Sequence, residues 1–78
     1  MNITLDATKL NDKEKAHEYL AEVLSLPDYY GKNLDALYDC VSDMNIDMIT
    51  IVNSDKGEFN YFAILEVFSD CGINIEYQ

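Results

Sequence analysis

Apolar residues recur at a spacing of two in some parts of this chain and at a spacing of three to four in others. Alternation with polar residues at 3–5 and at 73–77 predicts two short strands. Residues 48–52 are nearly all apolar and β-branched, so they predict a third strand that is covered on much of both faces. The stretches between these strands show helical spacing instead.

The first helical stretch is predicted from about residue 12 to residue 25. We expect Asn11 to cap this helix, because Glu14 follows three residues later as in a variant of the capping box. Pro27 should end the helix, since the residue before a proline avoids the helical region.

A second helix is predicted from Asn33 to Met44, with Asn33 as its N-cap. Its buried stripe consists of Leu34, Leu37, Val41 and Met44. The connector before this helix contains Gly31, which is free to take a positive φ.

A third helix follows the polar loop at 53–57, and Gly72 stands where a helix C-cap glycine belongs. Its apolar stripe consists of Tyr61, Ile64, Leu65 and Phe68. The order of strand, two helices, strand, helix and strand predicts an α/β fold, with helices packed on a small three-stranded parallel sheet. We expect one domain, residues 1–78, whose helices cover one face of the sheet better than the other.

The charge of the chain is strongly negative, because fifteen acidic residues face five lysines and no arginine, for a net charge of −10. Such a surface repels nucleic acids and anionic membranes and attracts cationic proteins, so we expect no nucleic-acid or membrane partner. The first residues lack the pattern of a signal peptide, and no stretch could span a membrane. With Cys40 and Cys71 as its only cysteines, the chain is expected to be a cytoplasmic protein with reduced thiols, monomeric when free.

Four aspartates recur at a spacing of four: Asp35, Asp39, Asp43 and Asp47. The first three lie on one face of the predicted second helix, nearly opposite its apolar stripe, with Tyr38 and Ser42 on one flank. Each like-charged pair at this spacing opposes the helix by roughly 0.2–0.5 kcal/mol. The pattern therefore favours a surface that binds a positive partner.

The four aspartates do not carry equal weight. Asp35 lies in the first turn, where a carboxylate favours the helix dipole without any partner. Asp43 is interpreted as a rim or solvated residue, and Asp47 as a loop residue outside the helix. Asp39, in the middle of the helix with acids on both sides, is the strongest candidate for function.

Residues 26–39, Leu-Pro-Asp-Tyr-Tyr-Gly-Lys-Asn-Leu-Asp-Ala-Leu-Tyr-Asp, resemble the signature of the barstar family. Members of this family are intracellular inhibitors of barnase-type bacterial ribonucleases. The resemblance implies a small parallel sheet with helices packed on it. It also implies a non-catalytic protein that plugs the active site of a small basic, extracellular ribonuclease in a 1:1 complex.

The resemblance assigns roles to individual residues of the second helix and the loop before it. It implies that Asp39 occupies the phosphate site of the ribonuclease, that Asp35 is a second buried acid, and that Tyr29 packs on the catalytic histidine. Gly31, Asn33 and Leu34 match contacts at the start of the helix. The carboxylates would then imitate RNA phosphates.

Other positions match the family less closely. Tyr38 and Met44 stand where the family has tryptophan, and Ser42 stands where it has threonine. Asp70 corresponds to an acidic rim residue on the last helix. We include all four in the predicted binding surface.

Several other functions are compatible with this sequence. An acyl-carrier-like domain suits the length and charge, although the stretch at 31–35 has no serine to carry a phosphopantetheine arm. The length and charge of the chain are also compatible with an immunity protein or an interaction module for another basic toxin or nuclease. Asp35, Asp39 and Asp43, which we call the aspartate ladder, could hold Ca²⁺ or Mg²⁺ only weakly, because no EF-hand loop is present. His17 with either cysteine has no motif of a hydrolase, so we expect no enzyme, no cofactor and no metal site.

Overall fold

The computed structural model describes all 78 residues, and it contains three strands, three α-helices and two short 3₁₀-helices. In chain order these are β1 (Asn2–Asp6), η1 (Ala7–Lys9), α1 (Lys13–Val23), α2 (Leu34–Ser42), β2 (Met48–Val52), η2 (Ser54–Lys56), α3 (Phe59–Asp70) and β3 (Asn74–Tyr77). None of the helices is long and apolar enough to cross a membrane.

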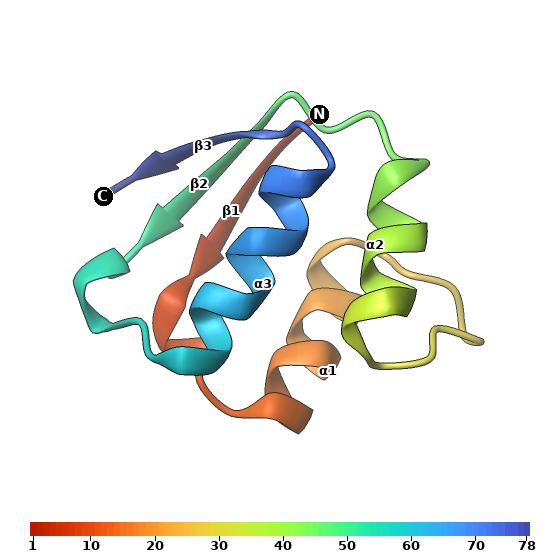
Figure 1. The fold of residues 1–78 in the computed structure, drawn as a ribbon, viewed down its shortest axis with the longest axis horizontal. Coiled ribbons are helices and arrows are strands. Elements are labelled where there is room, and N and C mark those ends of the chain that lie inside the picture. Colours follow the sequence, from red (N-terminus) through yellow and green to blue (C-terminus); the bar gives the residue numbers. More distant parts are fainter.

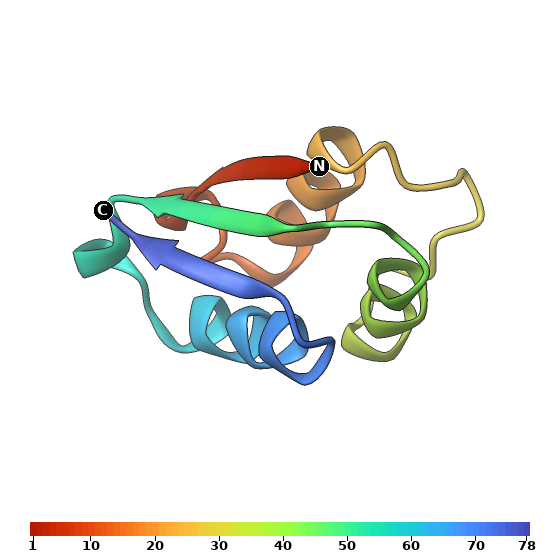
Figure 2. The ribbon, with the colours of Figure 1, turned by 90° about the horizontal axis from the view of Figure 1, so that it is seen from above.

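The three strands form one parallel sheet in the order β1-β2-β3, which confirms the predicted α/β class. In register, Ile3 pairs with Ile49 and Ile49 with Ile75. Figures 1 and 2 show α3 lying against one side of this sheet, with α2 beside α3 and α1 on the side of β1. A parallel sheet also argues against the acyl-carrier alternative, which requires an all-helical fold.

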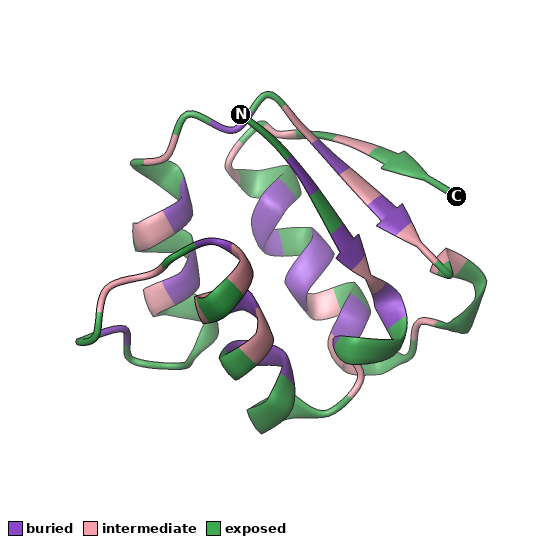
Figure 3. Cartoon of the chain, turned by 180° about the vertical axis from the view of Figure 1, so that it is seen from behind, coloured by how far each residue is buried: buried purple, intermediate pink, exposed green.

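One face of the sheet packs on the core and the other carries no helix, as expected, although the outward residues of β2, predicted to be covered on much of both faces, are still partly buried. Ile49 and Ile51 of β2 are fully buried, whereas Thr50 between them is half-buried. Seen from behind, the strands have no helix in front of them (Figure 3). The helices therefore bury a single layer of strand side chains. Burial of each such aliphatic side chain contributes roughly 1.5–3 kcal/mol.

α3 supplies the largest share of the core, because its predicted stripe of Tyr61, Ile64, Leu65 and Phe68 is buried throughout. The helix ends as predicted at Gly72, whose φ is 76°. The amides of Gly72 and Ile73 donate to the carbonyls of Ser69 and Phe68, at 2.9 and 3.2 Å. This is the double hydrogen bond of a Schellman motif, which requires a left-handed residue.

The start of α1 differs from the prediction, because Asp12 and not Asn11 is its N-cap. The Asp12 Oδ1 accepts from the amide of Lys15 at 2.9 Å. Asn11 instead ties the loop before α3: its side chain donates to the carbonyl of Lys56 at 3.0 Å and accepts from the amide of Glu58 at 2.8 Å. The long-range partners of Asn11 thus replace the predicted local cap.

The end of α1 also differs, because the helix stops at Val23, well before Pro27. Ser25 has a φ of 53°, and its amide donates to the Glu22 carbonyl at 3.3 Å. The Leu26 amide donates to the Ala21 carbonyl at 2.9 Å, which completes a second Schellman motif. A serine in the left-handed conformation, and not the proline, ends this helix.

α2 is shorter than predicted, since Ser42 is its last residue and Met44 lies beyond it. Leu37 and Val41 are buried as expected, but Leu34, in the first turn, is 38% exposed. The expectation of a buried Leu34 is therefore wrong, because the first turn extends past the edge of the core.

Asn33 caps α2 as predicted, and its Oδ1 accepts from the Ala36 amide at 2.8 Å. The positive φ before the helix belongs to Lys32, at 54°, and not to Gly31. A Cβ on Gly31 would lie 3.3 Å from the Asn33 Nδ2, an atom that donates to the Gly31 carbonyl at 3.2 Å. A side chain at this position would therefore require the capping side chain of Asn33 to shift by a few tenths of an ångström.

Candidate partner-binding surface

The outer face of α2 carries the aspartate ladder into solvent. Leu37 and Val41 anchor the inner face of the helix in the core. Asp35, Asp39 and Asp43 are all exposed on the other side, as the spacing predicts. Asp43 has backbone angles of the C-cap, so the ladder occupies the whole length of this short helix.

These carboxylates have no positive partner within the protein. The only ion pair in the structure joins the Met1 amino group to Asp47, at 2.7 Å. Asp47 lies in the loop between α2 and β2, which confirms that it is not part of the helix. The charges of Asp35, Asp39 and Asp43 are therefore uncompensated inside the chain and available to an external cation.

Two neighbouring tyrosines in the loop before α2 point in opposite directions. Tyr29 is 87% exposed, whereas Tyr30 is buried. The Tyr30 hydroxyl shares a hydrogen bond of 2.6 Å with Nδ1 of His17, which is also buried. Burial, with a smaller effect from Cys40, raises the pKa of Tyr30 to about 12. Tyr30 thus anchors the loop, and Tyr29 is presented to solvent.

The loop joins α2 through hydrogen bonds that leave its outer edge free. The Tyr30 amide donates to the Pro27 carbonyl at 2.9 Å, and Asn33 bonds both the Gly31 carbonyl and the first turn of α2. Gly31, Asn33 and Leu34 are exposed beside this junction. The structure therefore brings these three predicted contact residues together with Asp35 at the start of the helix.

Tyr38 and Ser42 lie on the flank of α2 that faces the end of α3. Tyr38 is 44% exposed, and the Ser42 hydroxyl donates to the Asp39 carbonyl at 3.0 Å. The Cys71 sulfur lies 4.0 Å from the Tyr38 carbonyl oxygen, which places the exposed Asp70 beside this flank. Burial, with a smaller effect from Asp70, raises the pKa of the Cys71 thiol.

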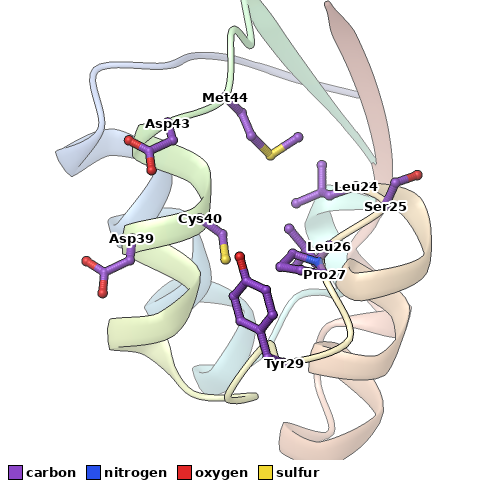
Figure 4. A pocket seen from close by; sticks show the side chains of 9 residues that line it. All are labelled: Leu24, Ser25, Leu26, Pro27, Tyr29, Asp39, Cys40, Asp43 and Met44. Carbon is purple, nitrogen blue, oxygen red and sulfur yellow. The ribbon is translucent and has the colours of Figure 1, made fainter.

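A groove of about 350 Å³ runs along the other flank of α2, between this helix and the segment that follows α1. It is lined by Leu24, Ser25, Leu26, Pro27, Tyr29, Asp39, Cys40, Asp43 and Met44. In Figure 4 the Met44 side chain extends toward Leu24, and the carboxylates of Asp39 and Asp43 lie at the outer rim, turned away from the floor. Met44 thus lies on the opposite flank from Tyr38 and Ser42.

The predicted residues therefore occupy one continuous side of the molecule but not one spot. The loop and the ladder form its centre, Tyr38, Ser42 and Asp70 one flank, and Met44 the other. Sequence reasoning missed the groove, because its walls come from two segments that the pattern of α2 alone does not connect. A possible signal was the run of apolar residues just past the end of α1.

No group of three or more acidic, histidine or cysteine side chains in the structure is arranged to hold a metal ion. What the surface offers is exposed carboxylates and rings on a rigid helix. Carboxylates in this arrangement can accept charge-assisted hydrogen bonds from arginine and lysine, and the rings can stack on flat groups.

Comparisons with known proteins give two matches for this chain. The family model described as "Barstar (barnase inhibitor)" matches residues 1–72 of the chain. A protein of Bacillus subtilis (strain 168), named "Putative ribonuclease inhibitor YrdF", is 45% identical over 40 residues, which make up 51% of this chain and 44% of that protein. The chain therefore covers less than half the length of this relative.

Proposed function

Since this chain belongs to the barstar family, we propose that it is an inhibitor of a small basic ribonuclease of the barnase type, and not an enzyme. In this proposal α2 and the loop before it plug the active site of the nuclease in a 1:1 complex. The name of the Bacillus subtilis relative supports the same class of activity.

The observation that carries the proposal is the uncompensated charge of Asp35 and Asp39 next to the exposed ring of Tyr29. A ribonuclease binds phosphate with arginine, lysine and histidine in a cleft that focuses positive potential. A carboxylate can replace a pair of phosphate oxygens there, because arginine grips it with two parallel hydrogen bonds. Asp39, at the centre of α2, is the residue that would enter this cleft most deeply.

Rigidity of the surface supports an inhibitory role. The Asn33 cap holds the start of α2, and Tyr30 holds the loop through His17. An aspartate has few rotatable bonds, so Asp39 loses little conformational entropy when it is immobilised. A surface that is already ordered spends less of its binding energy on ordering. Tyr29 would then pack on the catalytic histidine of the nuclease.

The net charge of −10 supports fast association. A negative protein approaching a positive cleft is steered toward it, and steering raises the association rate more than the final affinity. Fast association would let the inhibitor block the ribonuclease before much RNA is cleaved.

Cleavage of a fluorogenic RNA by barnase, titrated with this protein, tests the proposal. We expect inhibition that is complete at one equivalent. Asp39→Ala should weaken binding at least about 30-fold, because it removes one partner of a buried charge pair.

The matched control is Asp55→Ala, which removes one charge from an exposed residue of η2 with no polar partner. It should change the affinity by less than about threefold, through the long-range field alone. If Asp39→Ala inhibits as well as the original chain, α2 does not enter the active site. If an excess of the original chain leaves cleavage by barnase unchanged, the proposed function is wrong.

A further inference from the structure

We propose that the groove beside α2 binds an arginine side chain of the protein partner, with Asp43 as the residue that selects it. This inference rests on the proposed function, which concerns the outer face of α2, and adds a second contact on its flank. It identifies a residue that controls which basic partner is preferred.

The walls of the groove are suited to the aliphatic part of a long side chain. Leu26 and Pro27 form one wall, Met44 lies opposite, and the Tyr29 ring closes one end (Figure 4). Leu26, Pro27 and Met44 are partly buried, and Leu26 and Met44 are already packed against the core. Its volume of about 350 Å³ lies at the lower end of the range for ligand pockets, which fits a side chain better than a larger ligand.

The rim of the groove is negative and has no cation of its own. Asp39 and Asp43 are one helical turn apart at this rim, and neither forms an ion pair within the protein. Asp43 also stands at the C-terminal end of α2, where the helix dipole adds partial negative charge. A carboxylate at the C-terminal end of a helix is unfavourable for the helix. The charge of Asp43 is therefore compensated only when an external cation binds.

Apolar walls, a ring and two carboxylates together match arginine better than lysine. The guanidinium is planar and weakly hydrated, stacks on aromatic rings and donates to carboxylates in pairs. Its methylene stem can lie along Leu26 and Met44 while the head reaches the rim. A lysine ammonium would keep more of its hydration shell and gain less from Tyr29.

Dissociation kinetics with barnase test this contact through two matched variants, Asp43→Asn and Asp55→Asn. Both remove one charge from an exposed residue, and Asp43→Asn should slow association somewhat more because Asp43 lies on the face that the partner approaches. Only Asp43→Asn should speed dissociation, by about tenfold, because it removes one partner of a contact pair. Equal dissociation rates for the two variants, in a complex that still inhibits, would overturn the inference and leave the proposed function intact.

A second measurement does not depend on any nuclease. Nα-acetyl-arginine amide, titrated into the ¹⁵N-labelled free protein, should shift the amides of Tyr29, Cys40 and Met44 in a saturable way. Nα-acetyl-lysine amide should shift them less, and Asp43→Asn should abolish the effect. Shifts that are spread evenly over the acidic surface, with Asp55 as affected as Asp43, would overturn the groove as a site. A failure of barnase inhibition alone would overturn the proposed function and leave this result to decide on the groove.

Discussion

Tyr30 and His17 form the polar contact that fixes the position of the loop before α2. The hydroxyl of Tyr30 and Nδ1 of His17 are 2.6 Å apart, and both side chains are buried. A buried polar atom that loses its partner costs its full desolvation penalty, and this makes the contact sensitive to single substitutions.

Tyr30→Phe should lower the free energy of unfolding by about 1–3 kcal/mol, because it leaves the His17 nitrogen buried without a partner. Tyr29→Phe is the matched control. Tyr29 is 87% exposed, so the loss of its hydroxyl should change stability by less than about 0.5 kcal/mol. Urea unfolding of both variants measures the difference, and equal stabilities would show that the hydrogen bond contributes nothing.

The same pair makes stability depend on pH. Burial, with a smaller effect from Lys13, lowers the pKa of His17 from its ordinary value of 6.5. Below that value the unfolded chain binds a proton that the folded protein resists, so the free energy of unfolding falls as the pH drops below 6.5. Above that pH both states are neutral at this residue and the contribution is constant.

We therefore expect the original chain to lose stability as the pH falls from about 6.5 toward 5, by up to about 1.4 kcal/mol per pH unit from this residue. His17→Gln should remove this part of the slope, because glutamine does not titrate. Urea unfolding at several pH values measures both slopes. Parallel curves for the two proteins would contradict a titrating His17.

At the scale of the element, α2 has a well-formed N-cap, but its charge pattern destabilises the helix. Asn33 satisfies the Ala36 amide, and Asp35 lies in the first turn, where its charge is favourable. Asp39 and Asp43 follow at the spacing where like charges repel. The N-cap and the buried face therefore stabilise the helix against the repulsion between aspartates on its outer face.

Asn33→Ala should lower stability by about 1 kcal/mol, the usual cost of a lost N-cap. Asn33→Asp is the matched control, since it keeps the oxygen that accepts from the Ala36 amide but loses the donor to Gly31. It should recover most of the stability, and thermal unfolding of the three proteins gives the ranking. An Asn33→Asp protein as unstable as Asn33→Ala would show that the bond to Gly31 matters more than the cap.

Removal of charge from the ladder should separate stability from binding. Asp39→Ala relieves repulsion from both neighbouring acids, so the free protein should be unchanged or more stable by up to about 1 kcal/mol. Its complex with the nuclease should nevertheless be much weaker than that of Asp43→Ala, since Asp39 is the central acid of the proposed contact. Equal losses of affinity for the two variants would point to a different pose of α2.

At the scale of the whole molecule, the net charge of −10 acts on folding and on association in opposite ways. Salt screens self-repulsion within the folded protein, and it also screens attraction to a basic partner. The net charge thus lowers the stability of the folded protein and raises its rate of association with a basic partner.

An increase in salt from about 0.02 M to about 0.2 M should raise the melting temperature of the free protein and slow its association with barnase at least about tenfold. Differential scanning fluorimetry and stopped-flow fluorescence give the two quantities. An association rate that is indifferent to salt would show that the acidic face does not steer the encounter.

The local pattern of the sequence predicts much of the secondary structure and burial of this protein. Residues 48–52 form the predicted strand, the stripe of α3 is buried, and Gly72 and Asn33 end and begin their helices as expected. The exposure of Asp35, Asp39 and Asp43 follows from the same logic. These features depend on periodicity and on hydrogen bonds within a few residues, which the order of the chain encodes directly.

Tertiary structure decided the rest. Asn11 was drawn away from α1 by the loop at 56–58, and Tyr30 was turned inward by His17, while Tyr29 beside it stayed in solvent. The groove that joins Met44 to Leu26 exists only because the end of α1 and the end of α2 lie side by side. Each of these outcomes depends on a partner more than ten residues away in the chain, and local spacing carries no information about which partner a side chain will meet.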